Sequence, residues 1–416
     1  MDPKPKGHAE TQRERPETLK LVQADFVDAF LAWSDVIASP EIFRLWAAIS
    51  CVAGALERRT WSETAMGHLF PNLYVMLSAG PGVGKDNAIN LTTKLWREVP
   101  GISMGPHSVN HASLLDALSG ADRKIIVGGK LVSEYHGLCL VVGEFIVLCP
   151  SHDLEFLGRL NQIYDCPPDF RELRKYHKGT EYVIAKPYLN ILAGNTPSLM
   201  KAVFPEEAWS GGFTSRLLMV YASTGPLAEP FAPGPNEDVK AILVDHLKRL
   251  TKMWGRFWWD EDAARRYLEW HRGGQKPKPT HTKLEHYCTR RTTHIQKLAM
   301  ISSASRGTDL HVTLPDVERA LTWLMLAEAT MPDVFRAMLG RSDMDVLNEL
   351  HYFLMGEHAR RKKAIPIGTI YAFIVARVPS EKARGLVEVA EISGRIKRVG
   401  EGLFVPVARG DQAGVE

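Results

Sequence analysis

Apolar residues recur at helical spacing near the start of the chain, where Phe26, Phe30 and Trp33 are followed by a second such stretch up to about Arg59. The pattern then changes to short, continuous apolar runs separated by amphipathic, helix-like stretches. We predict buried strands in these runs, which are 73–78, 138–142, 189–193 and 217–221. Because apolar strands that alternate with helices are typical of a parallel sheet covered on both faces, the pattern predicts an α/β core behind a small helical domain.

Two further changes of pattern divide the rest of the chain. The segment 225–237 is rich in proline and glycine and has few apolar residues to bury, so it predicts a linker. Helical periodicity returns over 238–340, and the last unit is predicted as helices followed by a hairpin around 400–402, an order typical of a winged helix-turn-helix. The predicted organisation is a flexible leader (1–20), an N-terminal helical domain (21–66), the α/β core (67–224), the linker (225–237), a helical lid-like region (238–340), a winged helix (341–409) and a tail (410–416).

Composition narrows the class of protein. The 416 residues are 45% apolar and 24% charged, an ordinary balance for folded domains, and no apolar run approaches the roughly 20 residues that span a membrane. The polar N-terminus contains no signal-peptide core. Five cysteines at scattered spacing indicate reduced thiols rather than a disulfide framework or a zinc site, and a net charge of +3 does not by itself indicate nucleic acid. We expect a cytoplasmic protein of several domains with no membrane partner.

The strongest motif lies in the run NLYVMLSAGPGVGKDNAINLTTKLW at 72–96. An apolar strand leads into a glycine-rich loop and then into an amphipathic helix, which is the order of a phosphate-binding P-loop; a glycine-rich turn without a ligand is the alternative. Ala79 and Asp86 depart from GxxxxGK[ST], at the first glycine and at the hydroxyl residue. Glycines let backbone N–H groups approach phosphate oxygens, and Lys85 reaches the β- and γ-phosphates. The predicted nucleotide-binding residues are Gly80, Pro81, Gly82, Val83, Gly84, Lys85, Asp86 and Asn87.

The next predicted core strand ends in Gly143-Glu144. In a P-loop ATPase, a strand that ends in Asp-Glu holds Mg²⁺ with the aspartate and polarises water with the glutamate. Glu144 is therefore the predicted catalytic carboxylate, and a solvent-facing strand end is the alternative. Because Gly143 supplies no carboxylate, we expect Asp86 to supply the missing one. Asp86 and Glu144 are therefore the predicted Mg²⁺ residues.

Polar residues also mark the two strands that follow. Asn195 and Thr196 end the third run, at the edge where ligands bind in open α/β sheets, and an amide there can orient the attacking water. The alternative is an asparagine that opens a turn before Pro197. Arg216 follows a glycine pair, which fits an arginine finger that reaches across a subunit boundary. A surface charge or an internal ion pair is the alternative for Arg216.

The order of these features resembles the core of AAA+ P-loop ATPases: a glycine-rich loop, a strand that ends at Glu144, a strand that ends at Asn195 and then Arg216. More closely, SPEIFRLWAAIS, VVGEF, YLNILAGNTP and GGFTSRLLMVY resemble a family of phage and prophage AAA+ ATPases that are described as helicase-like and organised like superfamily 3 replicative helicases. The resemblance covers about 25–225 and, more loosely, 285–330. It implies Walker A at 80–86, Walker B at Glu144, sensor 1 at Asn195 and the finger at Arg216.

The run 287–298 is similar to the lid helix that carries sensor 2 in related motors. The similarity implies that Arg290, or after it Arg291, contacts the γ-phosphate. A solvated basic helix face is the alternative.

Two segments contain candidate DNA contacts. In superfamily 3 helicases, a hairpin before sensor 1 carries basic and aromatic residues to the strand, and 178–180 is the predicted tip of such a hairpin. Cations neutralise phosphates and an aromatic ring stacks on a base, whereas a solvated basic face is the alternative. The predicted hairpin contacts are Arg171, Arg174, Lys175, Tyr176, His177 and Lys178. The predicted winged helix, which could instead bind proteins, adds Arg361, Lys362, Lys397 and Arg398.

The sequence thus predicts an ATP-dependent DNA helicase or translocase of a phage or mobile element. It would act in DNA replication as a hexameric ring on single-stranded or forked DNA, with ATP and Mg²⁺ bound between subunits. A separate primase or other replication proteins would be its partners. Two alternatives stay open: a non-motor replication initiator or helicase loader that uses ATP as an assembly switch, and an ATPase that acts on protein partners.

Overall fold

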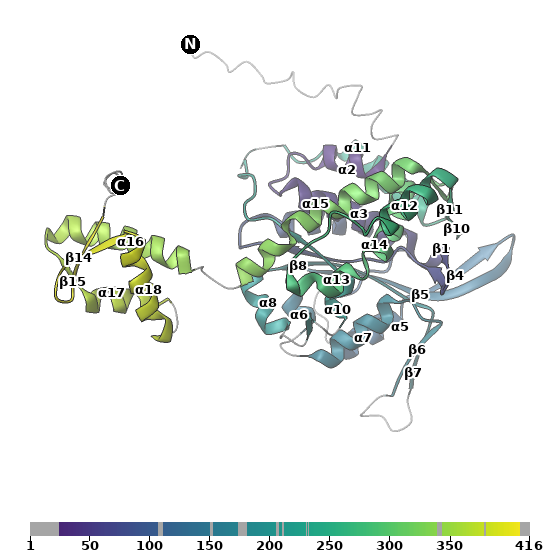
Figure 1. Ribbon diagram of the computed structural model, residues 1–416. Coiled ribbons are helices and arrows are strands. Elements are labelled where there is room, and N and C mark those ends of the chain that lie inside the picture. The colour runs from purple at the N-terminus through teal and green to yellow at the C-terminus, as the bar shows by residue number, and fades with distance from the viewer. Residues whose placement is uncertain are drawn as a thin grey trace, which may run out of the picture. The chain divides into compact units, whose positions relative to one another are not determined.

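The computed structural model describes residues 25–106, 111–149, 153–173, 181–204, 208–209, 212–229, 231, 233–338, 343–377 and 380–407. The chain divides into two compact units, Met1–Met338 and Leu339–Glu416. The described residues of each unit enclose a hydrophobic core of their own. Both units mix helices with β-sheet, as Figure 1 shows.

A five-stranded sheet with the order β4-β5-β8-β3-β9 lies at the centre of the first unit. Its strands are β3 (Tyr74–Ser78), β4 (Asp122–Val127), β5 (Lys130–Val142), β8 (Pro187–Asn195) and β9 (Leu217–Tyr221). Strands β5, β8, β3 and β9 pair in parallel, and every residue of β3 and β8 is buried, because helices cover both faces. The edge strand β4 is antiparallel to β5, so the predicted parallel sheet is in fact mixed.

Helices pack on both faces of this sheet. In Figure 1, α3 lies above the sheet and α7 below it, while α15 packs along the edge strand β9. The helices of the first unit are α2 (Phe26–Trp33), α3 (Glu41–Leu56), α4 (Lys85–Arg97), α5 (His111–Ser119), α6 (Phe145–Leu148), α7 (Leu154–Tyr164), α8 (Pro197–Val203), α10 (Phe213–Arg216), α11 (Glu237–Leu250), α12 (Glu261–Arg272), α13 (Glu285–Cys288), α14 (Arg291–Arg306) and α15 (Leu314–Met338), with short 3₁₀ turns at Glu57–Arg59 and Thr282–Leu284.

Short strands complete the first unit. They are β1 (Thr60–Thr64), β2 (Gly67–Leu69), β6 (Asp169–Leu173), β7 (Glu181–Ala185), β10 (Gly255–Arg256), β11 (Trp258–Trp259) and β12 (His311–Val312). Strand β1 pairs with β10 and β2, so the region predicted as an N-terminal helical domain also contains strands. Strands β6 and β7 form the antiparallel hairpin predicted before the Asn-tipped strand.

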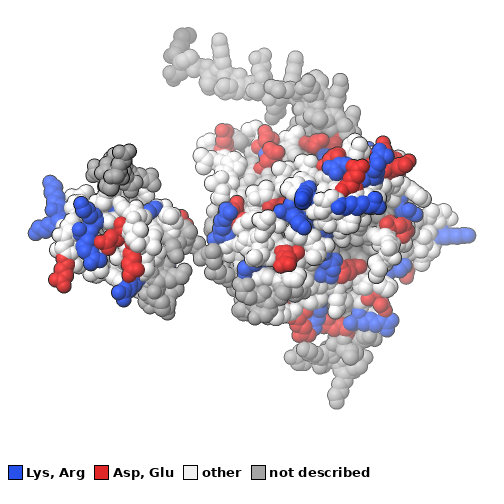
Figure 2. Space-filling view, in the orientation of Figure 1, with Lys and Arg blue, Asp and Glu red and all other residues white. Residues whose placement is uncertain are grey.

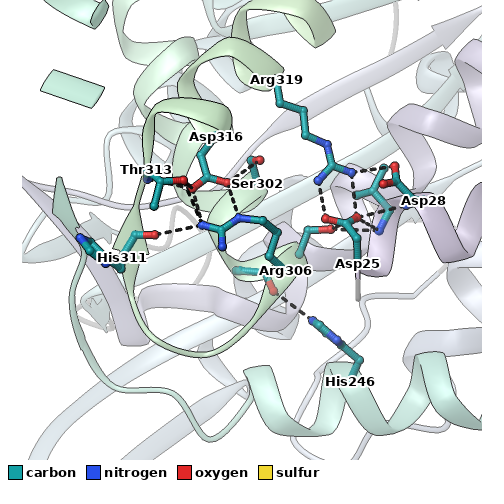
Figure 3. A network of polar contacts seen from close by, with 12 residues as sticks. Asp25, Asp28, His246, Ser302, Arg306, His311, Thr313, Asp316 and Arg319 are labelled. Atoms are coloured by element: carbon teal, nitrogen blue, oxygen red, sulfur yellow. Dashed lines mark hydrogen bonds and ion pairs between the residues drawn. The ribbon is translucent and has the colours of Figure 1, made fainter. Parts of the chain in front are cut away.

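One continuous core joins the three regions that the sequence suggests as separate domains. Its buried residues run from Phe26 in α2 through the sheet to Met338 in α15. A polar network, seen in Figure 3, adds to this connection: Asp25, the N-cap of α2, accepts hydrogen bonds from Ser305 Oγ at 2.6 Å and from Arg319 Nη2 at 2.7 Å. Burial opposes ionisation of Asp25, but the contacts with Arg319, Ser305 and the Asp28 backbone together outweigh it and lower the pKa of this carboxyl.

The described residues of the second unit form three helices and a three-stranded antiparallel sheet of order β13-β15-β14. Its elements are α16 (Asp343–Arg361), β13 (Ile365–Pro366), α17 (Ile367–Val375), α18 (Ser380–Ile392), β14 (Ile396–Gly400) and β15 (Leu403–Pro406). Strands β14 and β15 form the predicted terminal hairpin. Arg360 and Arg361 lie in the last turn of α16.

Candidate functional site

The glycine-rich loop joins the carboxyl end of β3 to the first residue of α4, which is Lys85. Gly82 and Gly84 have φ angles of 80° and 100°, a left-handed region that favours glycine. Gly84 also needs its small size, because an added Cβ would lie 2.4 Å from the Ala38 carbonyl oxygen. The loop borders a pocket of about 320 Å³, lined by Gly80, Pro81, Gly82, Val83, Gly84, Lys85, Asp86, Asn87, Glu144 and Thr196. All eight predicted loop residues therefore line one pocket, together with Glu144.

Lys85 extends across this pocket although only 6% of its surface is exposed. Its Nζ donates to the Ala79 carbonyl oxygen at 2.9 Å and to Thr196 Oγ1 at 3.4 Å, and lies 3.6 Å from Glu144 Oε1. The positive charge thus lies at the mouth of the glycine loop, where backbone N–H groups and a helix N-terminus also favour an anion.

Glu144 is held by a residue that follows the neighbouring strand. Strand β8 lies between β3 and β5, so Thr196, directly after β8, comes between the loop and Glu144. Glu144 accepts hydrogen bonds from the Thr196 backbone N–H at 3.0 Å and from Thr196 Oγ1 at 2.9 Å. Thr196 was not among the predicted site residues; its position beside Asn195 at a strand end is the signal that points to it.

Asp86 lies next to the position that lacks a carboxylate. A Cβ added to Gly143 would be 3.6 Å from Asp86 Oδ1, so this oxygen occupies the space in front of Gly143. Carboxylates at Asp86 and Glu144 are hard oxygen ligands of the kind that Mg²⁺ prefers, and the glycine loop and Lys85 fit a polyphosphate. The side chains present therefore fit a Mg²⁺-bound nucleotide.

Asn195 has a different environment from the one expected for a water-orienting amide. Its side chain is buried, Nδ2 donates to Ser78 Oγ at 3.4 Å, and Oδ1 has no hydrogen-bond partner among the described residues. Asn195 is not one of the residues that line the P-loop pocket, whereas its neighbour Thr196 is.

A second cavity, of about 620 Å³, adjoins the P-loop helix, and Asn87 lines both cavities. Asn87 Nδ2 donates to the Ala38 carbonyl oxygen at 2.7 Å, which connects α4 to the segment after α2. Part of the 225–237 segment lines the other side of this cavity, and a Cβ on Gly225 would lie 2.3 Å from the Val83 carbonyl oxygen. Gly225 thus approaches the backbone of the P-loop, while most described residues of the segment are exposed.

Arg216 lies at the amino end of β9, whereas Lys85 lies beyond the carboxyl end of the neighbouring strand β3. It precedes β9, whose first residue pairs with Tyr74 at the amino end of β3, so the length of β3, roughly 13 Å, separates it from the loop of its own chain. Only 9% of Arg216 is exposed. Its guanidinium donates to both carboxylate oxygens of Asp165, at 2.5 and 3.3 Å, and to the Gly212 carbonyl oxygen at 2.9 Å. The alternative of an internal ion pair is thus the state seen here.

Arg290 joins the same carboxylate rather than the P-loop pocket, since its Nη1 donates to Asp165 Oδ1 at 3.2 Å. Arg291 is fully buried and donates to the Glu328 carboxylate at 2.6 and 2.7 Å, so it is a packing residue. Burial raises the pKa of Glu328, against the opposing effect of Arg291. Of the two sensor 2 candidates, Arg291 thus contacts Glu328, and Arg290 shares Asp165 with Arg216.

The predicted DNA contacts fall in two places. Arg174, Lys175, Tyr176, His177 and Lys178 lie outside the described residues. Arg171, on β6, is exposed and forms an ion pair with Asp169 at 2.6 Å.

The candidate cations of the second unit are exposed, and two of them lie against acidic groups. Arg361 contacts Glu357 at 2.7 Å and Arg398 contacts Glu391 at 3.3 Å, while Lys362 and Lys397 are exposed. On the face drawn in Figure 2, basic and acidic residues lie among one another in both units.

Among the described residues, no group of three or more His, Cys, Asp or Glu side chains is arranged to hold a metal ion. Within the same residues, every helix is too short or too polar to cross a membrane. A comparison with protein-family models gives no match, and no curated protein matches the chain. The likeness to helicase-like ATPases therefore depends on the motifs quoted above.

Proposed function

We propose that this chain is an ATPase, and specifically an ATP-dependent DNA helicase or translocase that acts in the replication of a phage or mobile element. One observation carries the proposal: Lys85 and Asp86, which follow β3, and Glu144, which follows β5, converge with the glycine loop on a single pocket. Glycine-rich turns without a ligand have no need for a buried lysine and two carboxylates at their mouth.

Each residue of the pocket has a distinct role in this proposal. The loop N–H groups and Lys85 bind the phosphates, and Asp86 with Glu144 would hold Mg²⁺. Bound Mg²⁺ would supply neutralisation of the phosphate charge. Glu144 orients and deprotonates the attacking water, and because each of its oxygens accepts one hydrogen bond from Thr196, a lone pair stays available for the water proton. The cavity beside Asn87 accommodates the rest of the nucleotide.

The motor part of the proposal depends on the resemblance and on two placements. Arg216 lies at the amino end of β9, away from the P-loop of its own chain. This position suits an arginine finger that contacts the nucleotide of a neighbouring subunit in a hexameric ring. Arg171, which is exposed on the β6–β7 hairpin, suits a contact with single-stranded or forked DNA. The order α16, β13, α17, α18, β14, β15 supports the proposal of a winged helix-turn-helix, which would bind duplex DNA or a partner such as a separate primase. Such a motor would work in the bacterial cytoplasm.

The first experiment is ATP turnover with and without single-stranded DNA, for the native chain and for Lys85→Ala. We expect turnover that depends on Mg²⁺, rises with DNA and disappears in the variant. Arg265→Ala, which removes an exposed arginine from α12, is the matched control and should leave turnover unchanged. Turnover that survives Lys85→Ala would contradict the assignment of the site.

A second candidate is an ATP-dependent assembly switch of the initiator or loader type. The observation that favours it is that Thr196 engages both oxygens of Glu144 while Gly143 supplies no carboxylate. Binding of ATP without turnover, together with ATP-dependent assembly, would make this candidate the better one. An ATPase that acts on protein partners would differ from both, because neutralising Arg174, Lys175 and Lys178 would leave its activity unchanged.

A further inference from the structure

The small sheet of order β10-β1-β2 has indole rings on its outward face (Figure 1). On β1, Thr60 is buried and Trp61 is partly exposed. On the neighbouring segment, Phe257 is buried between the exposed Arg256 and Trp258. Because side chains alternate along a strand and Trp61 pairs with Arg256, the three side chains that are not buried share the outward face. Solvated sheet faces usually carry polar residues, so these rings call for a reason.

The rings on this face lie close to one another. The Trp61 ring stacks on His68 with 4.9 Å between ring centres, and Trp254 meets Trp61 edge-on at 5.1 Å. Trp258 is 61% exposed, and the Arg256 guanidinium lies over its ring, 4.3 Å from the centre. Trp258 thus keeps most of its surface open to solvent while a cation is held beside it.

Cations accompany these rings. Within 246–259 there is no acidic residue and there are four exposed cations, which are Lys248, Arg249, Lys252 and Arg256. Arg249 lies 3.4 Å from Asp245, whereas the other three have no ion-pair partner among the described residues. Glu63, on the same face, accepts a hydrogen bond from Trp61 Nε1 at 3.1 Å and lies 3.2 Å from His68 Nε2. The face therefore combines an open indole with cations that lack counter-ions.

Building on the function proposed above, we infer that this face binds single-stranded nucleic acid, with Trp258 as a stacking platform for a base and the three unpaired cations as phosphate contacts. Aromatic rings that stack on bases, together with cations along the backbone, hold single strands without reading their sequence. A duplex has no unpaired base to place on the ring, and an acidic protein segment would use the cations but would not need an open indole. The charge and the rings together favour a single strand. The face is separate from the β6–β7 hairpin and gives the strand a second contact.

The first experiment measures binding of a labelled oligothymidylate to the full chain without ATP, by fluorescence anisotropy. We expect Trp258→Ala to weaken binding about fivefold or more and Trp258→Phe, which keeps a ring, to weaken it less. Phe231→Ala removes a ring that is 98% exposed elsewhere, and Arg265→Ala removes an exposed cation from α12, so these two controls should leave the affinity unchanged. An affinity that is the same in Trp258→Ala would overturn the inference.

Salt dependence tests the cations separately from the ring. Lys248→Ala combined with Lys252→Ala should lower the slope of log affinity against log salt by about 1.4, the value for two phosphates of a single strand. A duplex of the same length should lose affinity with this lysine pair but not with Trp258→Ala, because its bases are already stacked on each other. If Trp258→Ala weakened binding of the duplex and the single strand equally, the ring would not be a platform for a base.

A cross-link locates the bound strand directly. An oligonucleotide that carries iodouracil, irradiated with the full chain, should form an adduct at Trp258 that mass spectrometry locates and that Trp258→Ala lacks. Adducts found only in other segments would overturn the inference. Competition between oligothymidylate and oligouridylate distinguishes DNA from RNA: tighter binding of either one, with the same loss in Trp258→Ala, supports a single-strand site for that nucleic acid.

These measurements separate this inference from the proposed function. A chain that binds the oligonucleotide through Trp258 but never turns over ATP would contradict the ATPase proposal and keep this face as a binding site. If DNA stimulated ATP turnover equally in the native chain and in Trp258→Ala, and the anisotropy were also unchanged, the motor would stand and this face would be rejected.

Discussion

At the scale of single residues, the position of one carboxylate decides how the P-loop pocket could hold a metal ion. The strand that ends at Glu144 has glycine where a second acidic residue is usual, and Asp86 Oδ1 lies in front of that glycine. These two departures from the usual motif are therefore neighbours in space, although 57 positions separate them in the chain, and our hypothesis is that Asp86 compensates for Gly143.

Removal of the Asp86 carboxylate tests this compensation. We expect Asp86→Asn to lower Mg²⁺-dependent ATP turnover by about tenfold or more, or about 1.4 kcal/mol of activation free energy. Gly143→Asp in addition should restore part of the loss, since a side chain at this position meets only Asp86 Oδ1, at an ordinary contact distance. A Mg²⁺ titration of turnover for the three proteins is the measurement, and an unchanged Asp86→Asn protein would refute the idea.

Lys297 makes folding stability depend on pH. Only 1% of it is exposed, and burial lowers its pKa to about 7. Between pH 7 and its ordinary pKa of about 10.4, the unfolded chain holds a proton that the folded chain lacks, so the lysine's contribution to stability rises with pH in this window. Below pH 7 both states are protonated and the cost of burying the charge is complete.

We therefore expect the native chain to gain stability relative to Lys297→Met as pH rises from 7.5 to 9.5, by on the order of 1 kcal/mol per pH unit. Urea unfolding of both proteins across this range is the measurement. Lys297→Arg stays charged throughout this range. Like Lys297→Met, it should therefore lack the gain in stability with pH that we expect of the native chain. A stability difference that stays constant with pH would mean that Lys297 does not titrate in this window.

At the scale of elements, the ends of neighbouring strands approach so closely that one of them requires glycine. A Cβ on Gly194, near the end of β8, would lie 2.1 Å from the Gly143 carbonyl oxygen, just past the end of β5. This close approach sets where Glu144 and Thr196 leave the sheet, so the geometry of the pocket depends on the packing of β5 against β8.

Gly194→Ala should destabilise the chain by about 2–4 kcal/mol, because the backbone of one strand must move. Chemical denaturation measures this loss, and nucleotide binding should weaken with it because Glu144 shifts. Gly158→Ala, in α7, is the control: no heavy atom lies within 4 Å of the added Cβ, so the helix should gain about 0.5–1 kcal/mol. Equal stability of the two variants would contradict the close packing.

At the scale of the whole molecule, the two units have separate hydrophobic cores. The core of the first unit ends at Met338 and that of the second begins at Val346, and among the described residues no residue belongs to both. Each unit can therefore bury its own apolar surface without the other.

A chain that ends at Met338 should fold and keep the thermal transition of the first unit, while the complete chain should show a second transition for residues 339–416. Calorimetry with near-ultraviolet circular dichroism on the two proteins is the measurement. If the shorter chain lacked fixed tertiary packing, the units would not be independent. If the shorter chain folds and binds DNA, the DNA-binding activity belongs to the first unit.

Features that depend on residues adjacent in the chain could be predicted from the sequence. The four continuous apolar runs are β3, β5, β8 and β9, because a strand buried on both faces cannot hide polar residues. Strand β4 was missed, since it lies at the edge with most of its residues exposed and carries no such run. The approach of Gly225 to Val83 was not predicted, because it involves the backbone, which composition does not reveal.

The sequence by itself determined the order of strand, loop and helix around Lys85, and the strands that bring Glu144 near it, because these depend on local spacing and apolar pattern. The tertiary structure decided which distant groups meet. Asp165 is 51 positions from Arg216 and 125 from Arg290, and Thr196 is 52 from Glu144. A charged side chain has no periodic pattern that names its partner, so only the packing of α7, α10 and α14 at the amino edge of the sheet brings two arginines to one carboxylate.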